Sequence, residues 1–295
     1  MDIGFSISNN QGIDSVQSIV DIATASEEQG LDSIWVSDHV FNASYIYDRI
    51  GDKPYYDPLT ILTFVAAKTS RIKLGPSILV LPYHHPIRLA KIAATLDHLS
   101  NGRLLMGIGV GVIPEEIQSM GVSPRQRGKF SDEAIILMKK LWTEPVVQHS
   151  GDFYSVPDFV FSPKPLQTPH IPILIGGTSE AAIKRATRIG NGWHPTANDP
   201  ETLRTGIELL HKDLEKQGRD VSDVPISISI PINSSTRDRN GLGSNPEEII
   251  ENSIAFKELG VSRLVASSYT NDLNDIFNNL DILAHHVMPN VKQGV

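Results

Sequence analysis

Residues 35–40 read WVSDHV, so the pair Asp38-His39 follows directly on an apolar run. A carboxylate beside an imidazole can bind a polar ligand and move a proton, because the unperturbed pKa of imidazole is about 6.5. The same two residues are also common in turns, where they only hydrogen-bond the loop. Position alone therefore leaves both a catalytic and a structural role open for His39.

A second candidate is IGGTSEAA, where Gly176 and Gly177 end an apolar run and a helical pattern begins at once. Free N–H groups at a helix N-terminus, with the hydroxyls of Thr178 and Ser179, are typical of an anion site. The alternative is a tight turn with a Ser/Thr N-cap. GIGVG (107–111) lacks the G-x-G-x-x-G spacing, and we interpret its alternating glycines as a place where a flat group approaches the backbone.

Metal chemistry and glycoside hydrolysis have weaker support. The chain has no cysteine, which excludes disulfides, catalytic thiolates and Cys-based zinc sites. His84 and His85 are adjacent, which is unfavourable for two ligands of one metal, and we expect no metal site. Asp38 and Glu115 could form a carboxylate pair for glycoside chemistry, but nothing in the sequence sets their separation.

The elements that must position these residues alternate along the chain. Short apolar runs predict strands, and the segments between them have apolar residues at helical spacing. Asp57, Asp199 and Asn245 each precede a proline, as expected for an N-cap followed by the first helical residue. The expected strands cover residues 3–7, 33–37, 72–81, 102–111, 171–177, 191–195, 224–232 and 262–268.

Eight strand-then-helix units predict parallel strands with right-handed crossovers, and hence an α/β fold of the (β/α)8 TIM-barrel class. A doubly wound open sheet is the alternative, but it would need a Gly-rich turn after the first strand, and SISNNQG offers none. We expect one domain over residues 1–295. Two insertions are expected, a hairpin with a Pro-rich return near 145–170 and a polar loop near 233–245.

Composition and charge exclude several kinds of partner. The 295 residues carry 26 Lys and Arg against 34 Asp and Glu, a formal charge of −8, with no long basic run. Nucleic acid and anionic membranes are therefore poor candidates as partners. The sequence MDIGFSISNN lacks the pattern of a secretory signal, and no apolar stretch approaches about 18 residues. We expect a soluble cytoplasmic protein that acts on a small molecule.

Several motifs occur together in an order that is specific to one family. They are GLDSIWVSDHV, PSILVLPYHHP, LDHLSNGRLLMGIGVG, RGKFSDEAIILMKKLW and PILIGGTSEAAIKRATRIGNGWHP. With them the chain resembles the luciferase-like monooxygenase superfamily, most of all the oxidoreductases that use the deazaflavin coenzyme F-420. Other branches use FMN. The resemblance implies a (β/α)8 barrel with insertion segments, a homodimer, and a cofactor ring lying across the strand ends.

The resemblance also implies roles for matching residues. Asp38 corresponds to a hydrogen-bond partner of the deazaflavin ring, and Ser77-Ile78 to a non-proline cis peptide behind it. Val80 corresponds to the ring edge. The backbone that meets the cofactor phosphate corresponds to Gly176, Gly177 and Thr178.

His39 matches a histidine over the reactive face that serves as base or stabiliser. The sugar-phosphate and alcohol dehydrogenases of the family carry a Trp after this His and a Glu after the glycine-rich strand, where this chain has Ala43 and Val112. Their substrates are therefore not carried over. We expect a different substrate pocket, built from Tyr45, Tyr83, His84, Glu115 and Trp193.

These residues and this resemblance are compatible with three functions. The first is an oxidoreductase that transfers hydride between F-420 and a small organic substrate. The second is an FMN-dependent monooxygenase that uses oxygen and a partner reductase. The third is a barrel that binds flavin without catalysis, which the retained Asp38-His39 and Gly176-Gly177 disfavour.

Overall fold

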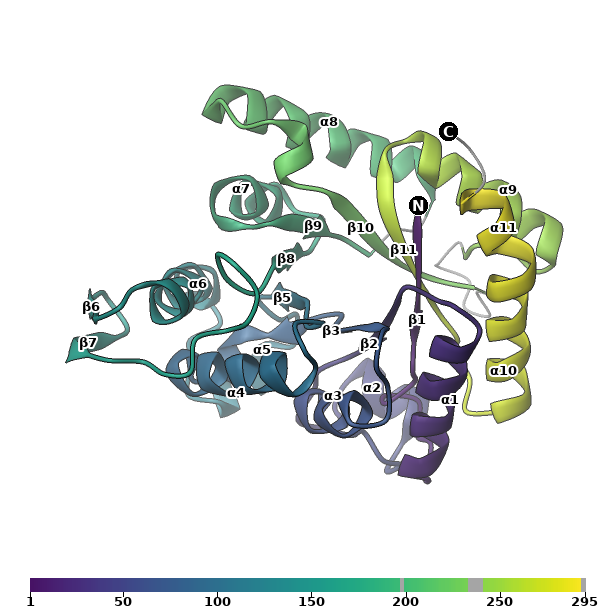
Figure 1. Cartoon of the computed structure of the whole chain (residues 1–295), viewed down its shortest axis with the longest axis horizontal. Coiled ribbons are helices and arrows are strands. Elements are labelled where there is room, and N and C mark those ends of the chain that lie inside the picture. The colour runs from purple at the N-terminus through teal and green to yellow at the C-terminus, as the bar shows by residue number, and fades with distance from the viewer. Residues whose placement is uncertain (197–198, 233–240, 293–295) are drawn as a thin grey trace.

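A parallel β-sheet closes into a barrel in the computed structural model, which describes residues 1–196, 199–232 and 241–292 (Figure 1). The strands follow the order β3-β2-β1-β11-β10-β9-β8-β5-β4. They are β1 (Asp2–Ser6), β2 (Ser33–Val36), β3 (Lys73–Pro76), β4 (Leu79–Val80), β5 (Met106–Gly109), β8 (Ile173–Gly176), β9 (Gly192–His194), β10 (Ile226–Pro231) and β11 (Val261–Ser267).

The barrel has eight positions because β3 and β4 are two parts of one interrupted strand. β3 pairs with β2, and β4 pairs with β5. A parallel bridge between Leu74 and Leu104 completes the ring, with the Leu105 N–H donating to the Leu74 carbonyl at 2.8 Å. The predicted (β/α)8 barrel is confirmed, and the open doubly wound sheet is wrong.

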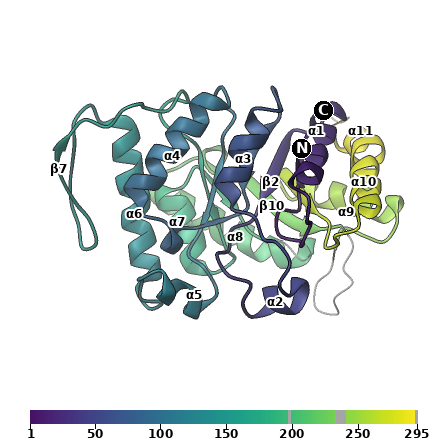
Figure 2. The same cartoon turned by 90° about the horizontal axis from the view of Figure 1, so that it is seen from below.

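Helices surround the barrel, and two short ones lie at one end of it. Figure 2 shows α2 and α5 together at that end, below the upright outer helices. The helices are α1 (Val16–Glu28), α2 (Tyr45–Ile50), α3 (Pro58–Ala66), η1 (Leu81–Tyr83), α4 (Pro86–Leu99), α5 (Pro114–Ser119), α6 (Arg127–Thr143), α7 (Glu180–Ile189), α8 (Pro200–Gln217), η2 (Val221–Asp223), α9 (Pro246–Glu258), α10 (Leu273–Ile282), η3 (Leu283–Val287) and α11 (Met288–Lys292).

Side-chain caps determine where several helices begin. Asp57, Asp199 and Asn245 each accept a hydrogen bond from the backbone N–H three residues later, and a proline follows each of them. These three predicted starts are confirmed. Among the described helices, none is long and apolar enough to cross a membrane.

The first expected insertion contains an antiparallel hairpin that projects from the barrel (Figure 1). Its strands are β6 (Val147–Ser150) and β7 (Ser155–Phe159). Of the second expected insertion, residues 233–240 lie outside the described part of the chain.

The interruption between β3 and β4 is a bulge at Ser77-Ile78, whose peptide bond is cis as the family resemblance implies. A Cβ atom on Gly107 would lie 2.1 Å from the Pro76 carbonyl oxygen, and one on Gly109 only 2.0 Å from Ile78 Cδ1. The alternating glycines therefore make room for the protein's own bulge. Our interpretation that they admit a flat ligand is corrected for these two positions.

Gly109→Ala should destabilise the fold by about 1–3 kcal/mol, because the new methyl group overlaps the end of the Ile78 side chain. Ile78→Val removes the overlapping Cδ1 atom. The double variant should therefore lose less stability than the two single changes added together, as measured by urea unfolding.

Gly107→Ala is the matched control, because its methyl group would meet the Pro76 backbone carbonyl rather than a side chain. Ile78→Val should not rescue it. Equal coupling of Ile78→Val to both alanine variants would contradict this description of the bulge.

Candidate active site

Asp38 lies two residues after the end of β2 and connects this strand to the far side of the bulge. Its buried carboxylate accepts a hydrogen bond from the Val80 N–H at Oδ2, over 2.9 Å. The same oxygen lies 2.7 Å from Nε2 of His84, the residue after η1. Asp38 thus joins the ends of two neighbouring strands.

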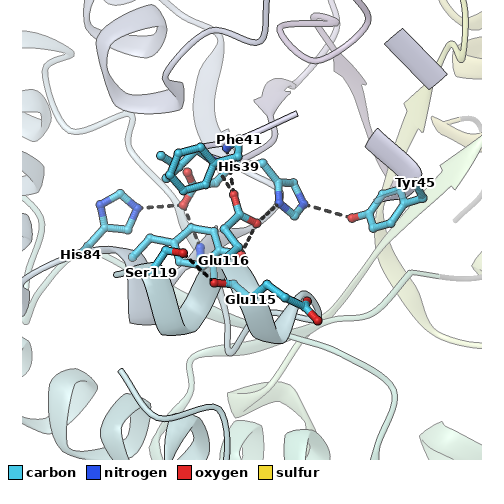
Figure 3. A network of polar contacts seen from close by, with 11 residues as sticks. His39, Phe41, Tyr45, His84, Glu115, Glu116 and Ser119 are labelled. Carbon is cyan, nitrogen blue, oxygen red and sulfur yellow. Dashed lines mark hydrogen bonds and ion pairs between the residues drawn. The ribbon is translucent and has the colours of Figure 1, made fainter. Parts of the chain in front are cut away.

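His39 points to a different set of partners. Its Nδ1 lies 2.7 Å from Oε2 of Glu116, and its Nε2 lies 3.0 Å from the Tyr45 hydroxyl. Figure 3 shows the imidazole between this carboxylate and this phenol, which come from α5 and α2. Only 12% of the His39 side chain is exposed. Both ring nitrogens are therefore held in place.

The Glu116 carboxylate is buried and takes part in four hydrogen bonds. Oε1 accepts from the N–H groups of Val40 and Phe41, at 2.7 and 3.1 Å. Oε2 is bonded to the His39 ring and accepts from the Tyr83 hydroxyl. A carboxylate has about four lone-pair positions, so these partners occupy all of them.

These hydrogen bonds outweigh the effect of burial on Glu116. Burial alone raises the pKa of this carboxyl. The hydrogen bonds from His39, Tyr83 and two backbone N–H groups together lower it by more than burial raises it, so the pKa lies below its usual range. Burial, the bond to Glu116 and its negative charge all raise the pKa of Tyr83. Tyr83 therefore stays protonated as a donor, and Glu116 stays ionised.

Beneath the bulge lies a second, fully buried histidine. His194 Nε2 is 2.8 Å from the Ser77 hydroxyl, and Nδ1 is 2.7 Å from the Ser227 hydroxyl. Its ring stacks on Trp35 with centroids 5.0 Å apart. Burial, assisted by the charge of Arg263, lowers the pKa of His194 to about 3, so the ring is neutral near pH 7.

The GGTS turn lies at the start of α7 and is largely open. Gly177, Thr178 and Ser179 are exposed, and the Ser179 hydroxyl caps the helix by accepting from the Ala182 N–H at 3.3 Å. A Cβ on Gly176 would lie 2.8 Å from Ile78, so the turn begins beside the bulge. The structure is therefore compatible with both interpretations of this motif, a capped turn and a helix N-terminus that is accessible to an anion.

The structure brings most of the predicted pocket residues together but corrects two of them. Tyr45 contacts His39, and His84 contacts Asp38. Tyr83 is buried and donates its hydroxyl proton to Glu116. Glu115 is exposed and its side chain points away from this group in Figure 3. The carboxylate of the site is its neighbour Glu116, which we did not predict.

Trp193 is the other correction. Its ring is buried in the core against Gly206 of α8, and its Nε1 donates to the Gly177 carbonyl at 2.8 Å. It therefore does not line a pocket. The next residue, His194, is the one that reaches Ser77 beneath the bulge.

The lowered pKa of His194 predicts that the folded protein becomes less stable in acid. The unfolded chain takes up a proton there near pH 6.5, whereas the folded protein does so only near pH 3, so stability falls as the pH drops through this window. The wild type should lose about 1.4 kcal/mol per pH unit more than His194→Gln. Urea unfolding between pH 7 and 4 measures this difference. His211→Gln, at an exposed site on α8, should keep the wild-type slope, and a His194→Gln slope equal to that of wild type would refute the assignment.

Comparison with known proteins shows which family the chain belongs to. The luciferase-like monooxygenase model matches residues 1–240. The F420-dependent glucose-6-phosphate dehydrogenase of Kineococcus radiotolerans is 32% identical over 256 residues, which is 85% of this chain and 71% of that protein. The protein of the same name from Amycolatopsis mediterranei is 30% identical over 253 residues, covering 83% and 71%.

Two solved structures share the fold at 20% identity. An F420-dependent secondary alcohol dehydrogenase in complex with an F420-acetone adduct matches with a TM-score of 0.83, covering 98% of both chains. The oxygenating constituent of 3,6-diketocamphane monooxygenase of Pseudomonas putida in complex with FMN matches at 0.75, also with 98% coverage of both. The family match over most of the sequence, together with this barrel, shows that the chain belongs to the luciferase-like monooxygenase family.

Proposed function

We propose that this protein is an oxidoreductase that transfers hydride between coenzyme F-420 and a small organic substrate, with His39 as the acid/base group. The observation that carries the proposal is the His39 imidazole, held at the strand ends by an ionised carboxylate. Catalytic sites of this barrel class lie at those ends. The relatives named as F420-dependent dehydrogenases, at 30–32% identity, support the choice of cofactor.

The residues present fit a deazaflavin cofactor. The bulge at Ser77-Ile78 is partly exposed and contacts Gly176, so a ring lying on it would be close to the open GGTS turn. The Ser8 hydroxyl, just beyond β1, is buried and has no hydrogen-bond partner among the residues that the structure describes, which leaves a polar atom for a ligand to satisfy. The residues we propose to hold the cofactor are Asp38, Ser77, Ile78, Val80, Gly176, Gly177 and Thr178.

Each part of this set has a defined task. The Asp38 bonds to Val80 and His84 both use Oδ2, and we assign Oδ1 to the polar edge of the ring. The exposed N–H groups and hydroxyl of the GGTS turn would bind the phosphate. When bound, the deazaflavin supplies a two-electron centre that accepts or donates hydride. The protein's own contribution is to orient the substrate and move its proton.

The surroundings of His39 favour a substrate with apolar surface. Val40, Phe41 and Tyr45 are each exposed by 45–49% on the loop and helix that carry the imidazole. Aromatic and aliphatic surface of this kind binds apolar groups by excluding water. We therefore do not assign glucose 6-phosphate as the substrate. A homodimer, and in the FMN alternative a reductase partner, stay predictions.

Purified protein should bind F-420 more tightly than FMN, as measured by fluorescence titration. Asp38→Asn should weaken F-420 binding by about 1.5–3 kcal/mol, because it replaces a charged acceptor. Asp48→Asn, an exposed change on α2, is the control and should leave binding unchanged. FMN binding without F-420 binding would instead favour the monooxygenase alternative.

His39→Ala should lower kcat by about 10²–10⁴-fold while the Kd for F-420 stays nearly constant, because the imidazole moves a proton rather than holding the cofactor. The assay follows F-420 absorbance with a panel of alcohols and carbonyl compounds. Equal losses in kcat and in cofactor affinity would show that His39 is a binding or structural residue.

A further inference from the structure

We propose that Arg49 and Tyr55 form a subsite that binds a carboxylate group of the substrate beside His39. Arg49 is in α2 and Tyr55 follows this helix, at the end of the barrel where α2 and α5 lie (Figure 2). The inference rests on the proposed function for naming this ligand as the substrate. The binding itself can be measured on the protein without cofactor.

The charge of Arg49 has no carboxylate partner. None of the ion pairs within the described part of the chain includes this residue. Its Nη2 donates to the Asn10 carbonyl at 3.1 Å, and its guanidinium carbon lies 5.7 Å from the centroid of the Tyr269 ring. Its Nε is buried and has no acceptor among the described residues. A partly buried cation of this kind is stabilised when an anion pairs with it.

The Tyr55 hydroxyl is a second buried donor without an acceptor among the residues that the structure describes. Burial raises the pKa of Tyr55 well above its usual value, so the phenol stays protonated near pH 7. The charge of Asp38 raises this pKa further and the charge of Arg49 opposes it, so the hydroxyl lies near both groups. The Ser37 hydroxyl is also nearby, but it already accepts from the Asn10 side-chain amide at 3.1 Å.

The two donors define the chemistry of the ligand. Arg49 offers a positive charge and an N–H group, and Tyr55 offers an O–H group. A carboxylate has one negative charge and two acceptor oxygens, so it satisfies both donors at once. A phosphate monoester has three acceptor oxygens and a charge of about −1.5 to −2, for which these donors are too few. A neutral ligand would leave the charge of Arg49 unpaired.

The subsite adjoins the proposed acid/base group. The Tyr55 ring lies edge-on to the His39 imidazole, with centroids 5.9 Å apart and an interplanar angle of 79°. The same ring packs against a buried cluster of Ile46, Ile50 and Ile113, which holds it in this position. A carboxylate bound at Tyr55 would therefore bring the neighbouring carbon atoms of the substrate close to His39.

The substrate class that fits is a hydroxy acid, or the oxo acid that its oxidation yields. Oxidation breaks the carbon–hydrogen bond, sends hydride to the deazaflavin and the hydroxyl proton to His39, and forms the carbonyl double bond. No further reactant is needed. The exposed Val40 and Phe41 offer apolar surface to the rest of the molecule. The subsite thus adds an anionic end to the apolar substrate of the proposed function.

Isothermal titration of the protein without cofactor tests the subsite, with phenyllactate as the probe and its neutral amide as the matched ligand. The wild type should bind the carboxylate about 10–100-fold more tightly than the amide. Arg49→Gln should bring this ratio close to one, and Arg49→Lys should restore part of it because the charge returns. Arg204→Gln, an exposed change on α8, should leave the ratio unchanged.

Tyr55→Phe separates a binding role from a structural one. It removes a hydroxyl without a described partner, so the free energy of unfolding in urea should not fall. The carboxylate-to-amide ratio should drop about 3–10-fold. Tyr47→Phe, an exposed change on α2, is the control and should alter neither quantity. A destabilised Tyr55→Phe protein would show that the fold itself uses this hydroxyl, and would overturn the subsite.

Two further outcomes would also overturn it. One is equal affinity of the wild type for phenyllactate and its amide, both with and without bound F-420. The other is displacement of phenyllactate by an equal concentration of inorganic phosphate, which would make phosphate the ligand. Carboxylate preference without F-420 binding would support the subsite and count against the proposed function. Turnover of neutral alcohols with F-420 and no carboxylate preference would do the reverse.

Discussion

The buried carboxylate of Glu116 holds the site together. It is 77 residues from His39 in the sequence, yet it binds that ring, two N–H groups of the loop after β2, and the hydroxyl of Tyr83 in η1. A buried charge is stable only when such donors surround it. The loop that carries His39 therefore has its position set by the same bonds that keep Glu116 ionised.

The adjacent pair Asp38-His39 serves two separate networks. Asp38 bonds to Val80 and pairs with His84 on the cofactor side of our proposal, whereas His39 bonds to Glu116 and Tyr45. Neighbouring residues of extended chain point in opposite directions, so one strand end can supply both groups. This division allows one residue to bind while the other moves a proton.

The barrel could be predicted from the sequence because its strands and long helices have strong hydrophobic periods and caps. The site depends on weaker signals. Tyr45 and Glu116 lie on α2 and α5, helices of six residues each, which are too short to show a period. We predicted Tyr45 for the pocket without knowing that it contacts His39. Whether Glu115 or Glu116 points inward depends on the helical phase, which the sequence alone does not determine.

A similar one-residue choice separates Trp193 from His194. Successive side chains of a strand face opposite sides, so an error of one residue moves the assignment from the barrel interior to the helix layer. We chose Trp193, which packs against α8, and overlooked His194. The cis peptide at Ser77-Ile78 could be predicted, because the resemblance of the motif PSILVLPYHHP to the family implies it. The structure has it at that position.

We propose that a deazaflavin ring lies on the bulge with its reactive carbon toward His39 and Tyr45. The most direct test is a crystal structure of the protein with F-420 bound. We expect the ring against Ser77-Ile78, Asp38 Oδ1 hydrogen-bonded to its polar edge, and the phosphate at Gly176–Thr178. A ring bound elsewhere, or one whose reactive face is turned away from His39, would contradict it.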